Sequence, residues 1–144
     1  MHTLEQVLRH RNLLTAHPGD RVLDVLRRMA LAKVGAVTIL ADEQLVGVFS
    51  ERDLMTRVVV AGLDPAATPV DAVMTRDVMT ADLHETRDEC LEKMQRRGCR
   101  HLPVMAGGRV IAMLSMRDLL RDEIEEETEE IRHLRAYVHQ TPLS

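Results

Sequence analysis

Two stretches of the chain share one pattern of hydrophobic and polar positions. Residues 45–49 and 110–114 are apolar runs, and each leads into a Ser-x-Arg-Asp-Leu segment that begins at Ser50 or Ser115. An apolar run of this length is typical of a buried strand, and the polar residues after it are typical of a helix start. The pattern therefore predicts the same strand-to-helix corner at two places.

The rest of the first half predicts two further helices and two further strands. Val22, Val25 and Met29 recur at helical spacing after a turn at Pro18, which predicts a helix with one buried face. The expected elements are a helix over residues 4–9 with a capping box from Thr3 and Gln6, a strand over 13–15, a helix from Asp20 to Gly35, strands over 36–40 and 45–49, and a helix from Ser50 to about residue 60.

The second half repeats this order after a linker that holds two prolines. The expected elements are a helix near residues 70–74, a strand over 78–80, a helix over 85–97, and strands over 100–104 and 110–114 joined by a turn at Gly107 and Gly108. Pro103 lacks a backbone N–H, which predicts an edge position for its strand.

A shift of 65 positions, with no gap, aligns the two halves. It matches ten identical residues, where chance would give roughly three. They are Thr3, Arg11, Thr15, Ala16, Leu26, Met29, Ser50, Arg52, Asp53 and Leu54 in the first copy. The chain is therefore a tandem duplication of a β-α-β-β-α unit, which predicts an α+β fold.

The last helix is expected to continue well beyond the length of its counterpart in the first copy. Leu120, Ile124, Ile131, Leu134 and Val138 alternate at steps of three and four, and Glu127 occupies the one polar step. Such a stripe predicts a partner helix. We interpret the acids of residues 122–130 as a solvated face rather than a metal site.

Composition narrows the classes of function. Phe49 and Tyr137 are the only aromatic residues, and a net charge of -4 without a basic stripe argues against nucleic acid as a partner. Cys90 and Cys99 lack the spacing of metal ligands and are expected to be buried, reduced thiols. Because no apolar run spans a bilayer and residues 1–5 do not resemble a signal peptide, we expect no membrane partner and a cytoplasmic location.

The two Ser-x-Arg-Asp segments admit a structural and a functional interpretation. Serine followed three residues later by an acid forms a capping box that satisfies backbone N–H groups. A helix start also favours anions, and an ionised aspartate beside it accepts two hydrogen bonds from a diol such as a ribose. The recurrence of the segment after two buried strands favours a binding role.

These residues resemble a tandem pair of cystathionine β-synthase (CBS) domains, also called a Bateman module. The matching segments are Met74-Thr75, Met79-Thr80, residues 100–104, residues 46–53 and residues 111–118, which are the second copy of residues 46–53. The resemblance implies two repeats with pseudo-twofold symmetry and a long C-terminal helix. We expect repeat 1 over residues 3–62, a linker over 63–69, repeat 2 over 70–123, and a C-terminal helix and tail over 124–144.

The resemblance also implies two clefts that bind adenosine-containing ligands. The first would use Ser50, Arg52 and Asp53 with Thr80, Cys99 and Arg100. The second would use Ser115, Arg117 and Asp118 with Thr15, Val34 and Gly35, and with Arg100 or His101 nearby. Since Gly35 and Ala36 stand where the second copy has Arg100 and His101, the cations come from one repeat only. The two clefts are therefore expected to differ in affinity.

The leading hypothesis is a regulatory module that senses AMP, ADP, ATP, NAD(H) or S-adenosylmethionine, forms a homodimer and acts on a regulated protein partner. The alternative is a dimeric scaffold protein with vestigial clefts, in which the Ser-x-Arg-Asp segments only cap helices. An enzyme is not expected, because the sequence shows no nucleophile paired with a base, no metal-ligand spacing among its seven histidines and no phosphate loop. We therefore expect no cofactor or metal, and an adenine nucleotide as the ligand.

Overall fold

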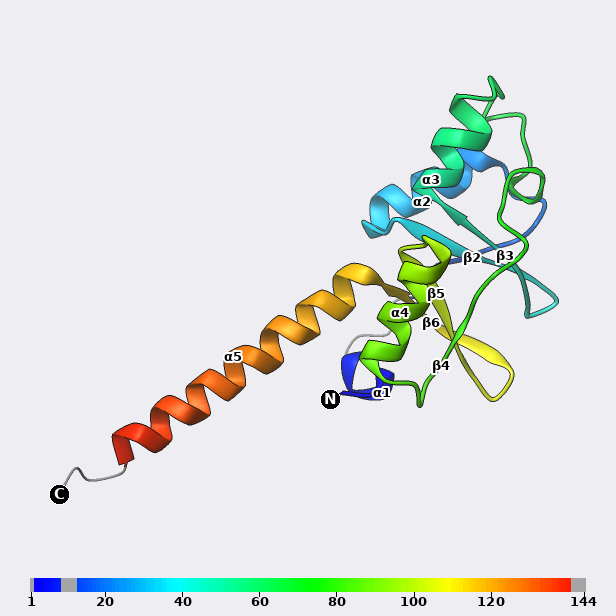
Figure 1. Cartoon of the computed structure of the whole chain (residues 1–144). Coiled ribbons are helices and arrows are strands. Elements are labelled where there is room, and N and C mark those ends of the chain that lie inside the picture. The colour runs from blue at the N-terminus through cyan, green and yellow to red at the C-terminus, as the bar shows by residue number, and fades with distance from the viewer. Residues whose placement is uncertain (1, 9–12, 141–144) are drawn as a thin grey trace.

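The computed structural model describes residues 2–8 and 13–140, in which two three-stranded sheets form a body and one long helix projects from it (Figure 1). The first repeat comprises α1 (Leu4–Val7), β1 (Thr15–Ala16), α2 (Val22–Ala32), β2 (Ala36–Ala41), β3 (Gln44–Ser50), α3 (Glu51–Asp53) and the π-helix η1 (Leu54–Val59). The second comprises the 3-10 helix η2 (Val70–Ala72), β4 (Ala81–Asp82), α4 (Arg87–Arg97), β5 (His101–Ala106), β6 (Arg109–Ser115) and α5 (Met116–Gln140).

The two sheets have the same topology, which confirms the predicted α+β repeat. In each sheet a short entry strand pairs in parallel with the central strand, and the central strand pairs with its successor as an antiparallel hairpin. Strand β3 of one sheet contacts β6 of the other. The strand-to-helix corners at Ser50 and Ser115 both follow the last strand of their sheet, as the sequence predicts.

The predicted edge position of Pro103 and the predicted strand at residues 78–80 are both wrong. β5 is the central strand of its sheet. In the first sheet Thr38 N donates to Leu14 O at 3.2 Å, and Thr38 pairs with Thr15. The corresponding position in the second sheet is Pro103, which has no N–H to donate. Pairing between β4 and β5 therefore begins one position later, at Ala81.

Helix bounds also differ from the prediction. α2 ends at Ala32 with Lys33 in the left-handed conformation, three residues before the expected Gly35. α1 ends at Val7, and the predicted end at Arg9 lies outside the described residues. Thr3 N donates to Gln6 Oε1 at 2.9 Å, as expected for the capping box. After Ser50 the helix widens into η1, whereas the helix after Ser115 is regular.

Each repeat contributes its leading segment to the core of the other. Leu4 is fully buried in the core of the second repeat, and its N–H donates to Glu85 O at 2.9 Å. Val70 and Met74 lie in the core of the first repeat, where Val70 N donates to Asp20 O at 2.8 Å. The linker joins two repeats that share their cores rather than two independent domains.

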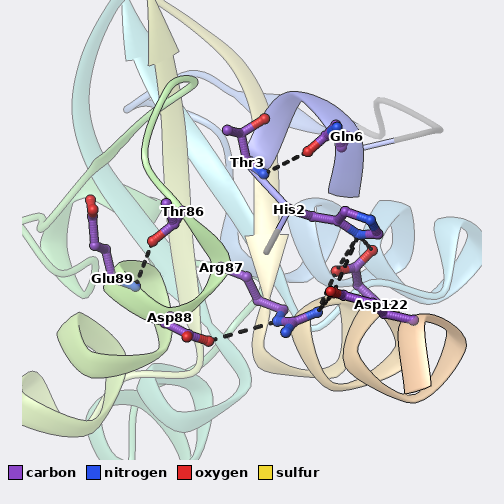
Figure 2. Close-up of polar contacts among 9 residues, drawn as sticks. His2, Thr3, Gln6, Thr86, Arg87, Asp88, Glu89 and Asp122 are labelled. Carbon is purple, nitrogen blue, oxygen red and sulfur yellow. Dashed lines mark hydrogen bonds and ion pairs between the residues drawn. The ribbon is translucent and has the colours of Figure 1, made fainter. Parts of the chain in front are cut away.

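A network of charged side chains fastens the N-terminal segment and α4 to the base of α5 (Figure 2). Arg87 Nη1 lies 2.9 Å from Asp122 Oδ2 and 2.6 Å from Glu126 Oε2, and His2 Nδ1 lies 2.9 Å from Asp122 Oδ1. Asp122 is only 5% exposed, so the predicted solvated face is wrong at this residue. Hydrogen bonding to Arg87 holds the pKa of Glu126 below its usual value.

Burial was predicted for both cysteine thiols, and the structure agrees fully for Cys90 and in part for Cys99. Cys90 is buried in the second core, and burial, together with the nearby Glu85 charge, raises the pKa of its thiol to about 12. Cys99 is half-buried. Among the described helices, none combines the length and the apolar character needed to cross a membrane.

Candidate functional site

Both Ser-x-Arg-Asp corners form capping boxes. Ser50 N donates to Asp53 Oδ2 at 3.0 Å, and Asp53 N donates to Ser50 Oγ at 3.4 Å. At the second corner, Ser115 N donates to Asp118 Oδ2 at 2.9 Å, and Asp118 N donates to Ser115 Oγ at 3.1 Å. The structural interpretation of the two segments is therefore confirmed, and it leaves open whether either corner also binds a ligand.

The first corner differs from the second in the contacts of its aspartate. Asp53 is buried, accepts a hydrogen bond from Thr75 Oγ1 at 3.0 Å, and lies 3.6 Å from Arg57 Nε. Thr75 is held there by a bridge to β3, in which Thr75 N donates to Val48 O at 2.8 Å and Val48 N to Thr75 O at 2.9 Å. The segment that enters the second repeat thus lines the first corner.

A cleft of about 650 Å³ opens beside this corner, between the two repeats. This volume falls within the range of small-molecule sites, roughly 300–1,000 Å³. Its lining residues are Gly35, Val48, Ser50, Glu51, Arg52, Asp53 and Met55 from the first repeat, and Thr75, Asp77, Val78, Met79, Arg97, Gly98, Cys99, Arg100 and His101 from the second. The cleft therefore combines apolar side chains with charges of both signs.

Three arginines line this cleft, and they differ in whether the side chain already has a hydrogen-bond or ion-pair partner. Arg52 crosses between the repeats and donates to Gly98 O at 2.7 Å, and Arg97 lies 3.0 Å from Asp77 Oδ2. The Arg100 side chain is exposed and makes no hydrogen bond or ion pair within the described residues. Arg100 is therefore the cation of the cleft that an incoming anion meets without first displacing a partner.

His101 lies where the two repeats meet. A Cβ atom at Gly35 would stand 3.3 Å from His101 Cε1, so the missing side chain at residue 35 gives the ring its room. Burial lowers the pKa of His101, although the charges of Glu51 and Asp118 oppose this shift. The ring is therefore held toward its neutral form, with one nitrogen able to donate and the other to accept.

The structure brings seven of the expected site residues to this cleft: Ser50, Arg52, Asp53, Cys99, Arg100, His101 and Gly35. Thr80 does not line it, and its carbonyl accepts a hydrogen bond from Lys93 Nζ at 3.1 Å. Gly35 and His101 were expected at the second cleft. The other residues expected there lie elsewhere: Val34 packs against the first core, the Thr15 carbonyl accepts from Arg28, and Ser115, Arg117 and Asp118 stand at the start of α5.

The sequence analysis did not assign Thr75, Asp77, Val78, Met79, Arg97, Gly98, Val48, Glu51 or Met55 to the cleft. The Met-Thr pair occurs twice, at Met74-Thr75 and Met79-Thr80. This repeated pair is the sequence signal that could have indicated a threonine beside Asp53. Only the antiparallel bridge to Val48 shows that Thr75, and not Thr80, supplies that hydroxyl.

The network at the base of α5 contains side chains of the types that bind metal ions. His2, Asp122 and Glu126 place three possible ligand atoms within 4.8 Å of one another. However, Arg87 already donates to both carboxylates, and the His2 ring nitrogen lies 2.9 and 3.0 Å from the two oxygens of Asp122. This geometry is typical of charge-assisted hydrogen bonding, and we interpret the cluster as a structural ion-pair network.

Comparison with known sequences gives a consistent result. The family model described as the CBS domain matches the chain twice, over residues 4–60 and 70–125. The chain is similar to the CBS domain-containing protein CBSCBSPB2 of Arabidopsis thaliana, with 39% identity over 118 residues that cover 81% of this chain and 22% of the relative. The chain therefore spans about a fifth of the length of that plant protein.

Solved structures have the same fold. A protein with CBS domains from Burkholderia ambifaria MC40-6 superposes with a TM-score of 0.83 at 28% identity, covering 99% of this chain and 100% of its own. The CBS domain pair of protein MJ0100, solved in complex with 5'-methylthioadenosine and S-adenosyl-L-methionine, gives a TM-score of 0.74 at 20% identity, covering 83% of this chain and 98% of its own.

Proposed function

Because this chain belongs to the CBS domain family, we propose that it is a regulatory module that binds an adenosine-containing nucleotide in the cleft beside Ser50 and Asp53. The observation that carries the proposal is the composition of this cleft. A buried carboxylate at a helix start, a free arginine and an apolar wall face one space of about 650 Å³. The fold of protein MJ0100 accommodates adenosyl ligands, which supports the same class here.

Each part of such a ligand has a counterpart in the cleft. The Asp53 carboxylate has two oxygens and can accept from the ribose hydroxyls. Val78 and Met79 offer apolar surface for the adenine ring. Arg100 presents a planar cation that suits a phosphate or carboxylate in bidentate geometry. We therefore expect a ligand that carries an anionic group as well as adenosine.

The second corner supports weaker binding. Asp118 has the same cap as Asp53, but Gly35 and Ala36 stand in the first repeat where the second has Arg100 and His101. The first corner shares its cleft with Arg100 and His101, whereas Asp118 does not line that cleft. Our proposal places the ligand in the first cleft.

The matched pair Asp53→Asn and Asp118→Asn tests this assignment. Both variants keep a capping side chain, but only Asp53 lines the cleft. Isothermal titration with AMP, ADP, ATP, NAD(H), S-adenosylmethionine and methylthioadenosine should show binding of at least one ligand to the unmodified chain. We expect Asp53→Asn to weaken that binding about tenfold or more and Asp118→Asn to leave it unchanged. Equal loss in both variants, or no binding at millimolar ligand, would contradict the proposal.

The capping roles of Asp53 and Asp118 favour a second candidate, a scaffold protein whose clefts bind nothing. Under this alternative, replacing either aspartate by alanine would lower the free energy of unfolding by about 1 kcal/mol through cap loss and change no binding. Either candidate is compatible with a homodimer that acts on a protein partner. Neither requires turnover of a nucleotide, so release of product from a bound ligand would argue for an enzyme instead.

A further inference from the structure

One cation of the cleft is already paired with an acid. Arg97 is the last residue of α4, and its Nη2 atom lies 3.0 Å from Asp77 Oδ2. The same nitrogen donates to the Asp77 carbonyl oxygen at 3.1 Å. Both residues line the cleft, as does Arg100, which has no hydrogen-bond or ion-pair partner within the described residues. Of these two arginines, only Arg97 therefore has a carboxylate beside it.

The Asp77 carboxylate is held only weakly against Arg97. The side chain of Asp77 is 90% exposed and that of Arg97 is 38% exposed. Within the part of the chain that the structure describes, this carboxylate has no other partner. An exposed ion pair contributes little to stability, because water screens both charges. An anionic group of a ligand can therefore take the place of the carboxylate at Arg97, but only in competition with it.

The other acids of the cleft make a second anionic group still less favourable. Glu51 and Asp53 line the cleft from the first repeat, and Asp77 adds a third acid from the second repeat. Asp77 belongs to the same repeat as Arg97 and Arg100, the two arginines that would attract phosphate. Like charges at short range repel each other. Asp77 thus acts in two ways with the same sign: it occupies Arg97, and it repels a phosphate that approaches this arginine.

We propose that Asp77 is a specificity-determining residue, which makes the cleft favour a ligand with one anionic group over a ligand with two adjacent ones. The single group binds at Arg100, and a second group meets Arg97 only after the Asp77 carboxylate has left it. The charge of Asp77 therefore lowers the affinity for a nucleoside diphosphate more than the affinity for the monophosphate. This inference rests on the proposed function, because it assigns a role within the same cleft.

The variant Asp77→Asn tests this role, because it removes the charge and keeps a side chain of similar size. The hydrogen bond from Arg97 to the carbonyl of residue 77 does not involve the carboxylate, so the arginine stays at the cleft. In isothermal titration at low salt, we expect the affinity for ADP to rise about fivefold and the affinity for AMP to change less than about twofold. Asp24→Asn is the matched control and should change neither affinity, because Asp24 forms an exposed ion pair with Arg27 on α2, outside the cleft.

A second measurement repeats the Asp77→Asn change in a chain that carries Arg97→Gln. The gain in ADP affinity should then shrink to about twofold or less, since no arginine is released. No gain for ADP, an equal gain for AMP and ADP, or a gain that persists without Arg97 would overturn the inference and leave the proposed function in place. If neither the unmodified chain nor any variant binds AMP or ADP, the inference is also overturned, and binding of the other adenosyl ligands then decides the proposed function.

Discussion

At the scale of single residues, His101 is close to the cleft, to the other repeat and to two acidic side chains. It lines the cleft, it packs against Gly35 of the other repeat, and it lies in the field of both Glu51 and Asp118. Its ring therefore reports on the packing of the two repeats as well as on the cleft.

The pKa of His101 predicts how stability depends on pH. Burial lowers this pKa in the folded chain, so the unfolded chain binds more protons as the pH falls through about 6.5. The free energy of unfolding should therefore fall between pH 7.5 and 5.5. Urea denaturation should show a smaller fall for His101→Gln than for the unmodified chain, whereas His84→Gln, at an exposed position, should retain the full slope.

The residues of the candidate site could be predicted only in part. Ser50 and Asp53 were predictable because a capping box is a local pattern within four residues. Thr75 was not assigned, because its place beside Asp53 depends on a bridge to Val48 that no local pattern reveals. Arg97 reaches the cleft from the end of α4, a position that the spacing of apolar residues does not encode.

At the scale of elements, the base of α5 depends on Arg87. Its side chain is 11% exposed and contacts the carboxylates of both Asp122 and Glu126, as Figure 2 shows for Asp122. His2 supplies the remaining donor to Asp122. The guanidinium thereby connects α4 to α5 across two acids that would otherwise face each other.

Replacing Arg87 with methionine should lower the free energy of unfolding by about 3 kcal/mol, because Asp122 stays buried without its cation. Arg96→Met is the control on the same helix. Arg96 pairs with Glu92 at 68% exposure of both side chains, so its loss should change stability by less than about 0.5 kcal/mol. Guanidinium chloride unfolding followed by circular dichroism would measure both, and equal effects would contradict the role given to Arg87.

The order and type of most elements followed from the sequence, and the exceptions have local causes. The strands that carry Ser50 and Ser115 were predictable because each apolar run is continuous. The start of β4 was not, because it depends on the missing N–H of Pro103 on a neighbouring strand. The widening of the helix after Asp53 into η1 has no counterpart in the second copy, although both helices begin with the same four-residue pattern.

At the scale of the whole molecule, the two repeats share their cores. The duplication was readable from the 65-residue shift, but the exchange of leading segments was not. A hydrophobic pattern shows that Leu4 is buried without showing which core receives it. In the structure this residue packs with the second repeat, and Val70 packs with the first.

Replacing Leu4 with alanine should therefore destabilise the second repeat more than the first. The fully buried side chain leaves a cavity, which should cost about 2–5 kcal/mol. Hydrogen exchange should show a larger loss of protection in α4 than in α2. Leu31→Ala removes an exposed side chain and should have little effect on either helix. Equal loss in α2 and α4 would mean that the two cores unfold as one unit.

The ion-pair network at the base of α5 also determines when, during synthesis, the segment around His2 can reach its final position. His2 and Asp122 are 120 residues apart in the chain, yet their side chains are in contact. At about 5–20 residues per second, a ribosome needs roughly 6–24 s to travel that distance. Throughout that interval Leu4 has no completed core to enter. Leu4 can therefore enter its core only after the last strand of the second repeat and the start of α5 have been made.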